Sequence, residues 1–277
     1  MHTEGMQHWI KVTPTGEIHA DARELWQFRH LFKVLVWRTL KVRYKQTLIG
    51  VGWAILQPLT MTLIFTVIFG RLAGMPTNGV PYPLFVISGL LVWQFVAQCF
   101  QSATMSVVSN AGLVTRIYFP RVLLPLTAIA AALFDFFCAL ATLVLLMVWY
   151  GVVPTLGVVA FIPVLGLAIL TVLGLSLWFG TLYVPYRDVG HLLPFLTQVW
   201  MFVSPVIYPT SLLPQQYQFI YSLNPIVAVI DTSRWAFCGA APPSVSGVLV
   251  SSCVAVVLCV SGFWFFRRHE RNFADVV

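Results

Sequence analysis

Asp135 is the ionisable residue of this sequence that lies within a predicted membrane span. A carboxyl group at membrane depth can bind and release a proton, as in proton-coupled carriers. Asp135 has no basic or second acidic partner in the neighbouring sequence, which favours a pore-facing or helix-capping carboxylate. A proton-coupled carrier that uses Asp135 stays open as an alternative.

ATP hydrolysis by this chain is not indicated. The phosphate-binding motif G-x-x-x-x-G-K-[ST] holds nucleotide phosphates with backbone amides and a lysine. Only four lysines occur, and none follows a glycine. We therefore predict a chain that is not an enzyme and that carries no cofactor of its own.

Metal chemistry is not indicated either. No two histidines stand four residues apart, no C-x-x-C pair occurs, and no G-x-S-x-G motif is present. Four of the five cysteines lie in apolar runs, where cysteine behaves as a small hydrophobic residue. The sequence predicts neither a metal site nor a disulfide.

The composition requires a membrane. Apolar residues make up 59% of the chain and charged residues 9%, against about 25% in soluble globular proteins. The net charge of +7 does not predict a nucleic-acid partner, because eight of the 16 Lys and Arg residues precede the first long apolar run. Such a juxtamembrane basic segment faces anionic membrane lipids. The first apolar run begins near Leu48, too late for a cleaved signal peptide.

Long charge-free blocks divided by Pro and Gly clusters predict an all-α, polytopic fold with six membrane spans. A polar cytoplasmic leader covers 1–20, and an amphipathic interfacial helix covers 21–47, with Asp21 and Glu24 as a capping box. A membrane domain covers 48–266, and a cytoplasmic tail covers 267–277. The six spans are predicted near 49–70, 84–107, 125–149, 159–183, 191–208 and 245–266.

The basic residues also predict the orientation. With both ends of the chain inside, fourteen Lys and Arg residues lie on the inner side and two, Arg71 and Arg234, on the outer side. Basic residues in short loops favour the cytoplasm, so we predict cytoplasmic N- and C-termini.

The stretch 204–244 fits neither a simple loop nor an ordinary span. It is rich in proline and contains Asp231 and Arg234, yet it is apolar over much of its length. Irregular backbone at membrane depth is tolerated inside protein or beside a water-filled cavity. We predict two short re-entrant helices at about 209–240, broken at Asn224-Pro225. A seventh span over 219–238 is the alternative.

One local signature points to a family. Residues 42–58 contain Arg-Tyr-Lys, a glycine pair, Trp53 and Pro58 at fixed spacing. This pattern resembles the R-Y-K-x-[ST]-x-L-G-x-x-W-x-x-x-x-P signature of permease subunits of type-2 ABC exporters, in the branch that exports O-antigen, capsule or teichoic acid. The second glycine, Gly52, is a small departure from that signature.

Three further segments resemble the same family in the expected order. They are Ile117-Tyr-Phe-Pro-Arg121, Pro185-Tyr-Arg-Asp188, and Ser204-Pro-Val-Ile-Tyr-Pro209 with Leu223-Asn-Pro225. The resemblance covers about residues 24–268. It implies a homodimer in the bacterial inner membrane, driven by two copies of a separate ATPase subunit that binds ATP and Mg²⁺.

The resemblance also implies roles for residues. The inner loops would meet the ATPase through Arg116, Phe119, Pro120, Arg121, Arg187 and Asp188. For Arg116 and Arg121 a contact with lipid phosphate is the alternative, and for Arg187 and Asp188 a pairing with each other or with the interfacial helix. A periplasmic gate would contain Pro205, Tyr208, Pro209, Asn224 and Pro225.

Aromatic residues are abundant, at 14% of the chain. Sugars bind to aromatic faces, and a sliding polymer needs contacts without strong directional bonds. An aromatic belt at the membrane interface and lipid-facing packing are the alternative explanation. The candidate channel residues are Trp53, Phe65, Phe69, Trp93, Phe195, Trp200, Phe202 and Tyr208. The predicted function is export of a lipid-linked polysaccharide, most simply of the O-antigen type, with a capsule polymer, teichoic acid, other lipid or drug as alternatives.

Overall fold

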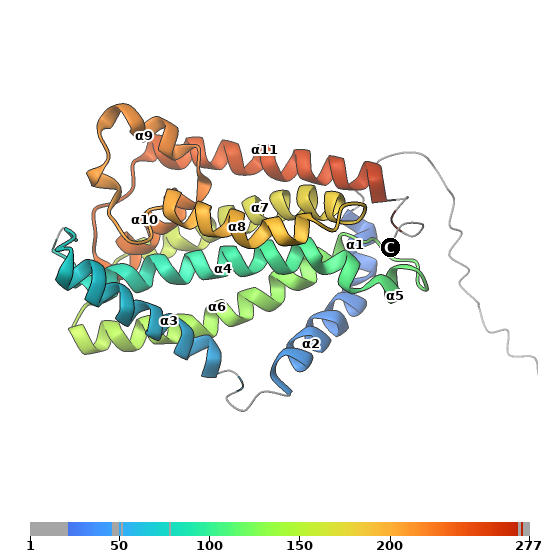
Figure 1. The fold of residues 1–277 in the computed structure, drawn as a ribbon, viewed down its shortest axis with the longest axis horizontal. Helices are drawn as coiled ribbons and strands as arrows, with labels where there is room; N and C mark the ends of the chain where they lie inside the picture. The colour runs from blue at the N-terminus through green and yellow to red at the C-terminus, as the bar shows by residue number, and fades with distance from the viewer. Residues whose placement is uncertain (1–21, 46–49, 51, 78, 271–272, 274–277) are drawn as a thin grey trace, which may run out of the picture.

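The computed structural model describes residues 22–45, 50, 52–77, 79–270 and 273, and these residues form an all-α protein without strands. Five of its helices are long and apolar enough to cross a membrane, which confirms the predicted polytopic all-α fold. Figure 1 shows most of them along the long axis of the molecule, with the first one oblique to the others. They are α3 (Gly52–Phe65) with its π-helical continuation η1 (Thr66–Leu72), α4 (Tyr82–Ser109), α6 (Leu123–Tyr150), α7 (Gly157–Tyr183) and α11 (Val245–His269).

The sixth apolar helix, α8 (Val189–Val203), is shorter than predicted. The prediction placed its end at residue 208, but the backbone of Ser204 is extended and ends the helix. A residue before proline disfavours the helical conformation, and Pro205 follows. Pro194, in contrast, lies inside α8 without interrupting it. At about 1.5 Å per residue, α8 spans less than the roughly 30 Å of a bilayer core.

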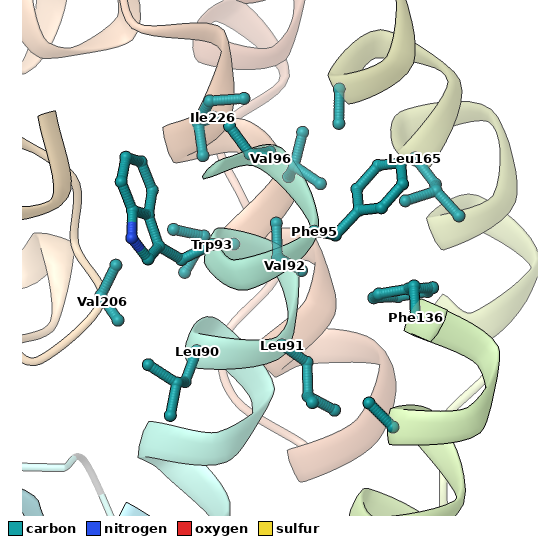
Figure 2. Close-up of a cluster of buried hydrophobic side chains, with 14 of the residues drawn as sticks. Leu90, Leu91, Val92, Trp93, Phe95, Val96, Phe136, Leu165, Val206 and Ile226 are labelled. Atoms are coloured by element: carbon teal, nitrogen blue, oxygen red, sulfur yellow. The ribbon is translucent and has the colours of Figure 1, made fainter. Parts of the chain in front are cut away.

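Helix α4 forms the centre of the bundle. It packs against α6, α7 and α10 (Pro225–Cys238), and its half nearest Tyr82 is buried on every side. Figure 2 shows Trp93 and Phe95 on opposite sides of α4, with Trp93 directed toward Val206 and Phe95 toward Leu165 and Phe136. The large apolar cluster around α4 therefore joins the long helices to the segment after α8.

Helices α9 (Gln215–Ser222) and α10 are separate, as the prediction of two short helices broken at Asn224-Pro225 requires. The Asn224 side chain caps α10 by accepting a hydrogen bond from the Ile226 N–H, Pro225 occupies the first turn, and Gly239 ends the helix with φ 68°. Asn224 lies beside Trp200, which packs on Trp93 near the middle of α4. Cys238 at the other end of α10 contacts the Leu84 carbonyl near the start of α4. No single helix forms over the predicted alternative span 219–238.

The two ends of the bundle differ. One end, called the α9 end here, carries α9 and the loop residues 73–77, 79–81, 151–156 and 239–244 (Figure 1). The other, called the α5 end, carries α5 (Ala111–Val114), the loop between α7 and α8, and the C-terminal end of α11.

The N-terminal region forms two helices, α1 (Ala22–Gln27) and α2 (Arg29–Lys45), in place of one continuous helix over 21–47. The predicted leader at 1–20 and the N-cap Asp21 lie outside the described residues. The apolar face of α1 and α2 packs at the α5 end, where Leu35 is buried and Leu25, Phe28 and Phe32 are partly buried. The predicted tail at 267–277 begins inside α11, which continues to His269.

Candidate transport site

Asp135 has partners that its sequence neighbourhood does not show. Arg43 and Tyr44, at the end of α2, both bind its carboxylate, and the Gln98 side-chain amide donates to it at 2.8 Å. The expectation of an acid without a basic partner is therefore wrong, because the partner comes from the helix before the first span. Asp135 is 8% exposed and holds α2, α4 and α6 together. A carboxylate that accepts from three donors is better suited to fixing helices than to exchanging protons.

The candidate channel aromatics divide by exposure. Trp53 on α3 and Phe195 and Phe202 on α8 are more than half exposed. Phe65, Phe69, Trp200 and Tyr208 are partly buried against the apolar cluster around α4. Trp93 is buried and packs edge-on against Trp200 with ring centroids 5.6 Å apart, so it belongs to the core of this chain.

Helices α3 and α8 expose most of their apolar surface. Only 11% of the apolar window of α3 and η1 is buried, and α8 buries one narrow stripe that contains Leu193 and Thr197. Helix α3 packs against α4 and α6, helix α8 packs against α4 and α7, and both leave their remaining faces uncovered. The uncovered faces of α3 and α8 are therefore available for contact with lipid, with a second copy of the chain or with a substrate.

The candidate gate residues converge on a buried arginine. Arg234 on α10 is 3% exposed and donates hydrogen bonds to the carbonyl oxygens of Pro205, Val206 and Tyr208. Its guanidinium carbon lies 3.7 Å from the Phe85 ring centroid, and Asp231 lies 3.7 Å from its terminal nitrogen. Arg234 thus fixes the segment after α8 against α4 and α10.

A second set of bonds holds the turn before α10. The Trp200 indole donates to Asn224 Oδ1 at 3.1 Å, and Asn224 Nδ2 donates to Ser204 Oγ at 3.0 Å. The hydroxyls of Tyr208 and Tyr221 lie 2.9 Å apart. Pro205, Pro209 and Pro225 are buried in the same region. The structure places the candidate gate residues along α10, from Asn224 at its start to the backbone carbonyls that Arg234 holds near its end.

The loop between α4 and α6 forms the surface of the α5 end. Arg116, Ile117 and Tyr118 are exposed, whereas Phe119 and Pro120 are buried. The Arg121 backbone N–H donates to Glu270 Oε1 at 2.7 Å. Phe119 and Pro120 therefore anchor the loop in this chain, and the exposed triplet before them faces outward.

The loop between α7 and α8 lies at the same end. Arg187 and Asp188 are both exposed, and the Arg187 guanidinium carbon lies 5.6 Å from the Tyr183 ring centroid. In the part of the chain that the structure describes, no ion pair joins Arg187 to Asp188 or to α2. The pairing considered as an alternative for these two residues is absent there.

The sequence model of the family described as ABC-2 type transporter matches residues 30–238. The chain belongs to this family.

Relatives of this ABC-2 family member extend the match over nearly the whole chain. It is 27% identical to the O-antigen export system permease protein RfbA of Klebsiella pneumoniae over 252 residues, which cover 90% of this chain and 96% of the relative. It is 28% identical to the protein of the same name from Myxococcus xanthus, with 92% and 98% covered. It is 26% identical to the polysialic acid transport protein KpsM of Escherichia coli, with 74% and 80% covered.

Sequence reasoning missed several contacts that this ABC-2 chain makes. Arg43 and Tyr44 belong to the motif that identified the family, but nothing in their spacing connects them to Asp135. Glu270 lies in what the sequence presents as a tail. Asp231 and Arg234 stood out as charges in an apolar stretch, and an opposite pair three residues apart was the available signal that they act together.

Proposed function

We propose that this chain is the membrane-spanning permease subunit of an ATP-driven exporter. Its substrate would be a lipid-linked polysaccharide of the O-antigen type, moved from the cytoplasm to the outer face of the bacterial inner membrane. The observation that carries the proposal is the similarity over at least 90% of this chain to proteins named O-antigen export permeases.

The energy for export would come from two copies of a separate ATPase subunit, which would hold ATP and Mg²⁺. The α5 end would face the cytoplasm, since it carries Arg116, Arg121, Arg187 and the basic end of α11. The exposed Arg116, Ile117 and Tyr118, with Arg187 and Asp188, are the surface proposed to meet that ATPase. Arginine and aromatic side chains dominate the energetics of protein interfaces, which supports this assignment.

A homodimer would form the pathway between two copies of the chain. The uncovered faces of α3 and α8 support this part of the proposal, because they present the exposed aromatics Trp53, Phe195 and Phe202. Sugars stack on such rings without strong directional bonds. Export of a capsule polymer is the second candidate, and the similarity to a polysialic acid transport protein favours it over a lipid or drug.

The decisive experiment is deletion of the gene followed by analysis of surface glycans. The expected result is loss of one surface polymer, accumulation of its lipid-linked form inside the cell, and recovery of both when the gene is restored. An unchanged set of surface glycans would contradict the proposal. The isolated chain is expected to show no ATP turnover, and substantial hydrolysis by the purified chain would also contradict it.

A further inference from the structure

Helix α4 has a polar, partly exposed face in its half nearest the α5 end. Gln94, Gln98 and Gln101 repeat at helical spacing on this face, with Ser102 beside them, and all four are partly exposed. The other half of α4, from Leu84 to Trp93, is completely buried. Helix α4 is therefore buried and mostly apolar in its first half, and it has a partly exposed polar face in its second half.

The three glutamines have unused hydrogen-bonding capacity. Gln98 donates to Asp135, and Gln101 Nε2 donates to Thr197 Oγ1 of α8 at 3.1 Å. Within the described residues, the side-chain oxygens of Gln98 and Gln101 accept no bond, and the Gln94 amide has no partner. Amide groups placed in hydrocarbon without partners are costly. This face of α4 is therefore expected to meet water or a polar ligand rather than lipid chains.

The membrane spans beside this face carry no free charge, and the exposed Lys41 and Lys45 lie outside those spans on α2. Ranges 52–70, 82–109 and 189–203, which contain α3, α4 and α8, include no Lys, Arg, Asp or Glu. Arg43, at the edge of the face, is paired with Asp135. A polyanion would need uncompensated cations along its path, whereas neutral amides donate to and accept from hydroxyl groups equally well.

A second copy of the chain fits this face less well than a glycan does. Helices that pack closely in membranes use small residues at the contact. Here most of the open face is formed by long side chains, Gln94, Gln98, Gln101 and Met105, with Ala97 and Ser102 as the small residues among them. Helices α3 and α8 both pack against α4, and their exposed aromatics present the stacking surfaces that sugars use.

We propose that Gln94, Gln98 and Gln101 form the sugar-contacting wall of the pathway, and that this wall hydrogen-bonds the hydroxyls of an uncharged, hydroxyl-rich polymer. The proposal rests on the proposed function and adds to it the residues that touch the polymer and the charge class of that polymer. Gln94 makes the direct contact with a free amide, while Gln98 and Gln101 offer their side-chain oxygens.

The test uses the complete exporter with its ATPase, expressed in the deletion strain. Gln94→Leu is expected to lower the export rate per transporter about fivefold, the effect of one neutral hydrogen bond. Gln94→Asn, which keeps an amide, is expected to recover part of the rate. Gln216→Leu on the exposed side of α9 is the matched control and should export normally. Membrane abundance and co-purification of the ATPase must be unchanged in each variant.

A photo-crosslinking residue at position 94 then identifies the contact. Capture of radiolabelled glycan supports the proposal, and capture of a second copy alone or of lipid alone overturns it. Export at the unaltered rate by Gln94→Leu also overturns it, provided that the unaltered gene restores the polymer. If the unaltered gene restores nothing, the proposed function itself fails. A lost polymer that carries a charge on each repeat would overturn the assignment of charge class.

Discussion

At the scale of single residues, Asp135 joins three helices through its bonds to Arg43, Tyr44 and Gln98. The side chain of Arg43 is 29% exposed and that of Asp135 is 11% exposed, so this ion pair is shielded from solvent. Removing one member of such a pair leaves a charge without compensation, which costs more than removing both.

We predict that Arg43→Ala and Asp135→Ala each lower thermal stability in detergent, and that the double variant loses less than the sum of the two. The coupling free energy should be about 0.5–3 kcal/mol, as for residues in direct contact. Additive losses would show that the pair contributes nothing. Asp135→Asn keeps one acceptor oxygen but removes the charge that compensates Arg43, so stability should fall while export per folded transporter persists. Loss of export in that variant, with normal abundance, would favour the proton-coupled carrier.

Sequence alone identified Asp135 as unusual but could not find its partner. Asp135 and Arg43 are 92 positions apart, and they meet only because α2 packs along α6. For the same reason the sequence placed Phe119 and Pro120 on a docking surface, although the apolar cluster at the α5 end buries Phe119. Residue type predicted that these positions have a role. The contacts that define each role come from helices far apart in the sequence, which residue type cannot predict.

At the scale of elements, α7 and α11 make the closest helix pair in the bundle. A Cβ atom added at Gly262 would lie 2.3 Å from the Gly174 carbonyl oxygen, and one added at Gly174 would lie 2.5 Å from the Leu258 backbone. The two glycines let the backbones touch, which is how small residues stabilise helix pairs in membranes.

We predict that Gly262→Ala separates α7 from α11 and lowers thermal stability by several degrees in detergent. Gly166→Ala is the matched control, because it lies in α7 and an added Cβ meets nothing within 4 Å. That change should be neutral or raise stability by about 0.5–1 kcal/mol, since alanine favours the helix. Equal effects of the two substitutions would contradict the packing argument.

Helix boundaries show how far sequence reasoning extends at this scale. Charge-free blocks located every long span, because the cost of placing charges in hydrocarbon acts on each residue separately. The end of α8 was placed too late, since the apolar run continues through Val206 and Ile207 while the backbone turns at Ser204. Those two residues are apolar because they pack on the α4 cluster after the turn, and not because the helix continues.

At the scale of the whole molecule, the α5 end behaves as one packed unit behind its exposed loop. A second apolar cluster joins Leu35 of α2, Phe119 and Val122 beside α6, Leu177 of α7, and Phe266 of α11 with Phe273 after it. Glu270 adds a polar connection, because it accepts from the Arg121 backbone and pairs with Arg267 at 3.3 Å. A force applied to the loop at 116–118 is thereby shared among several helices.

We therefore predict that loss of the Glu270 side chain weakens the coupling between ATP hydrolysis and export. In the assembled exporter, Glu270→Ala should leave ATP hydrolysis largely intact and lower the amount of polymer exported per ATP, because the loop can move without the helices behind it. The loss of stability should be about 1.5–3 kcal/mol, the range for a hydrogen bond to a charged group. Arg268→Ala is the control, since this exposed side chain lies over Trp264 and forms no hydrogen bond or ion pair with the loop among the described residues. Parallel loss of hydrolysis and export would mean that Glu270 supports ATPase docking, and unchanged export per ATP would mean that the loop needs no such anchor.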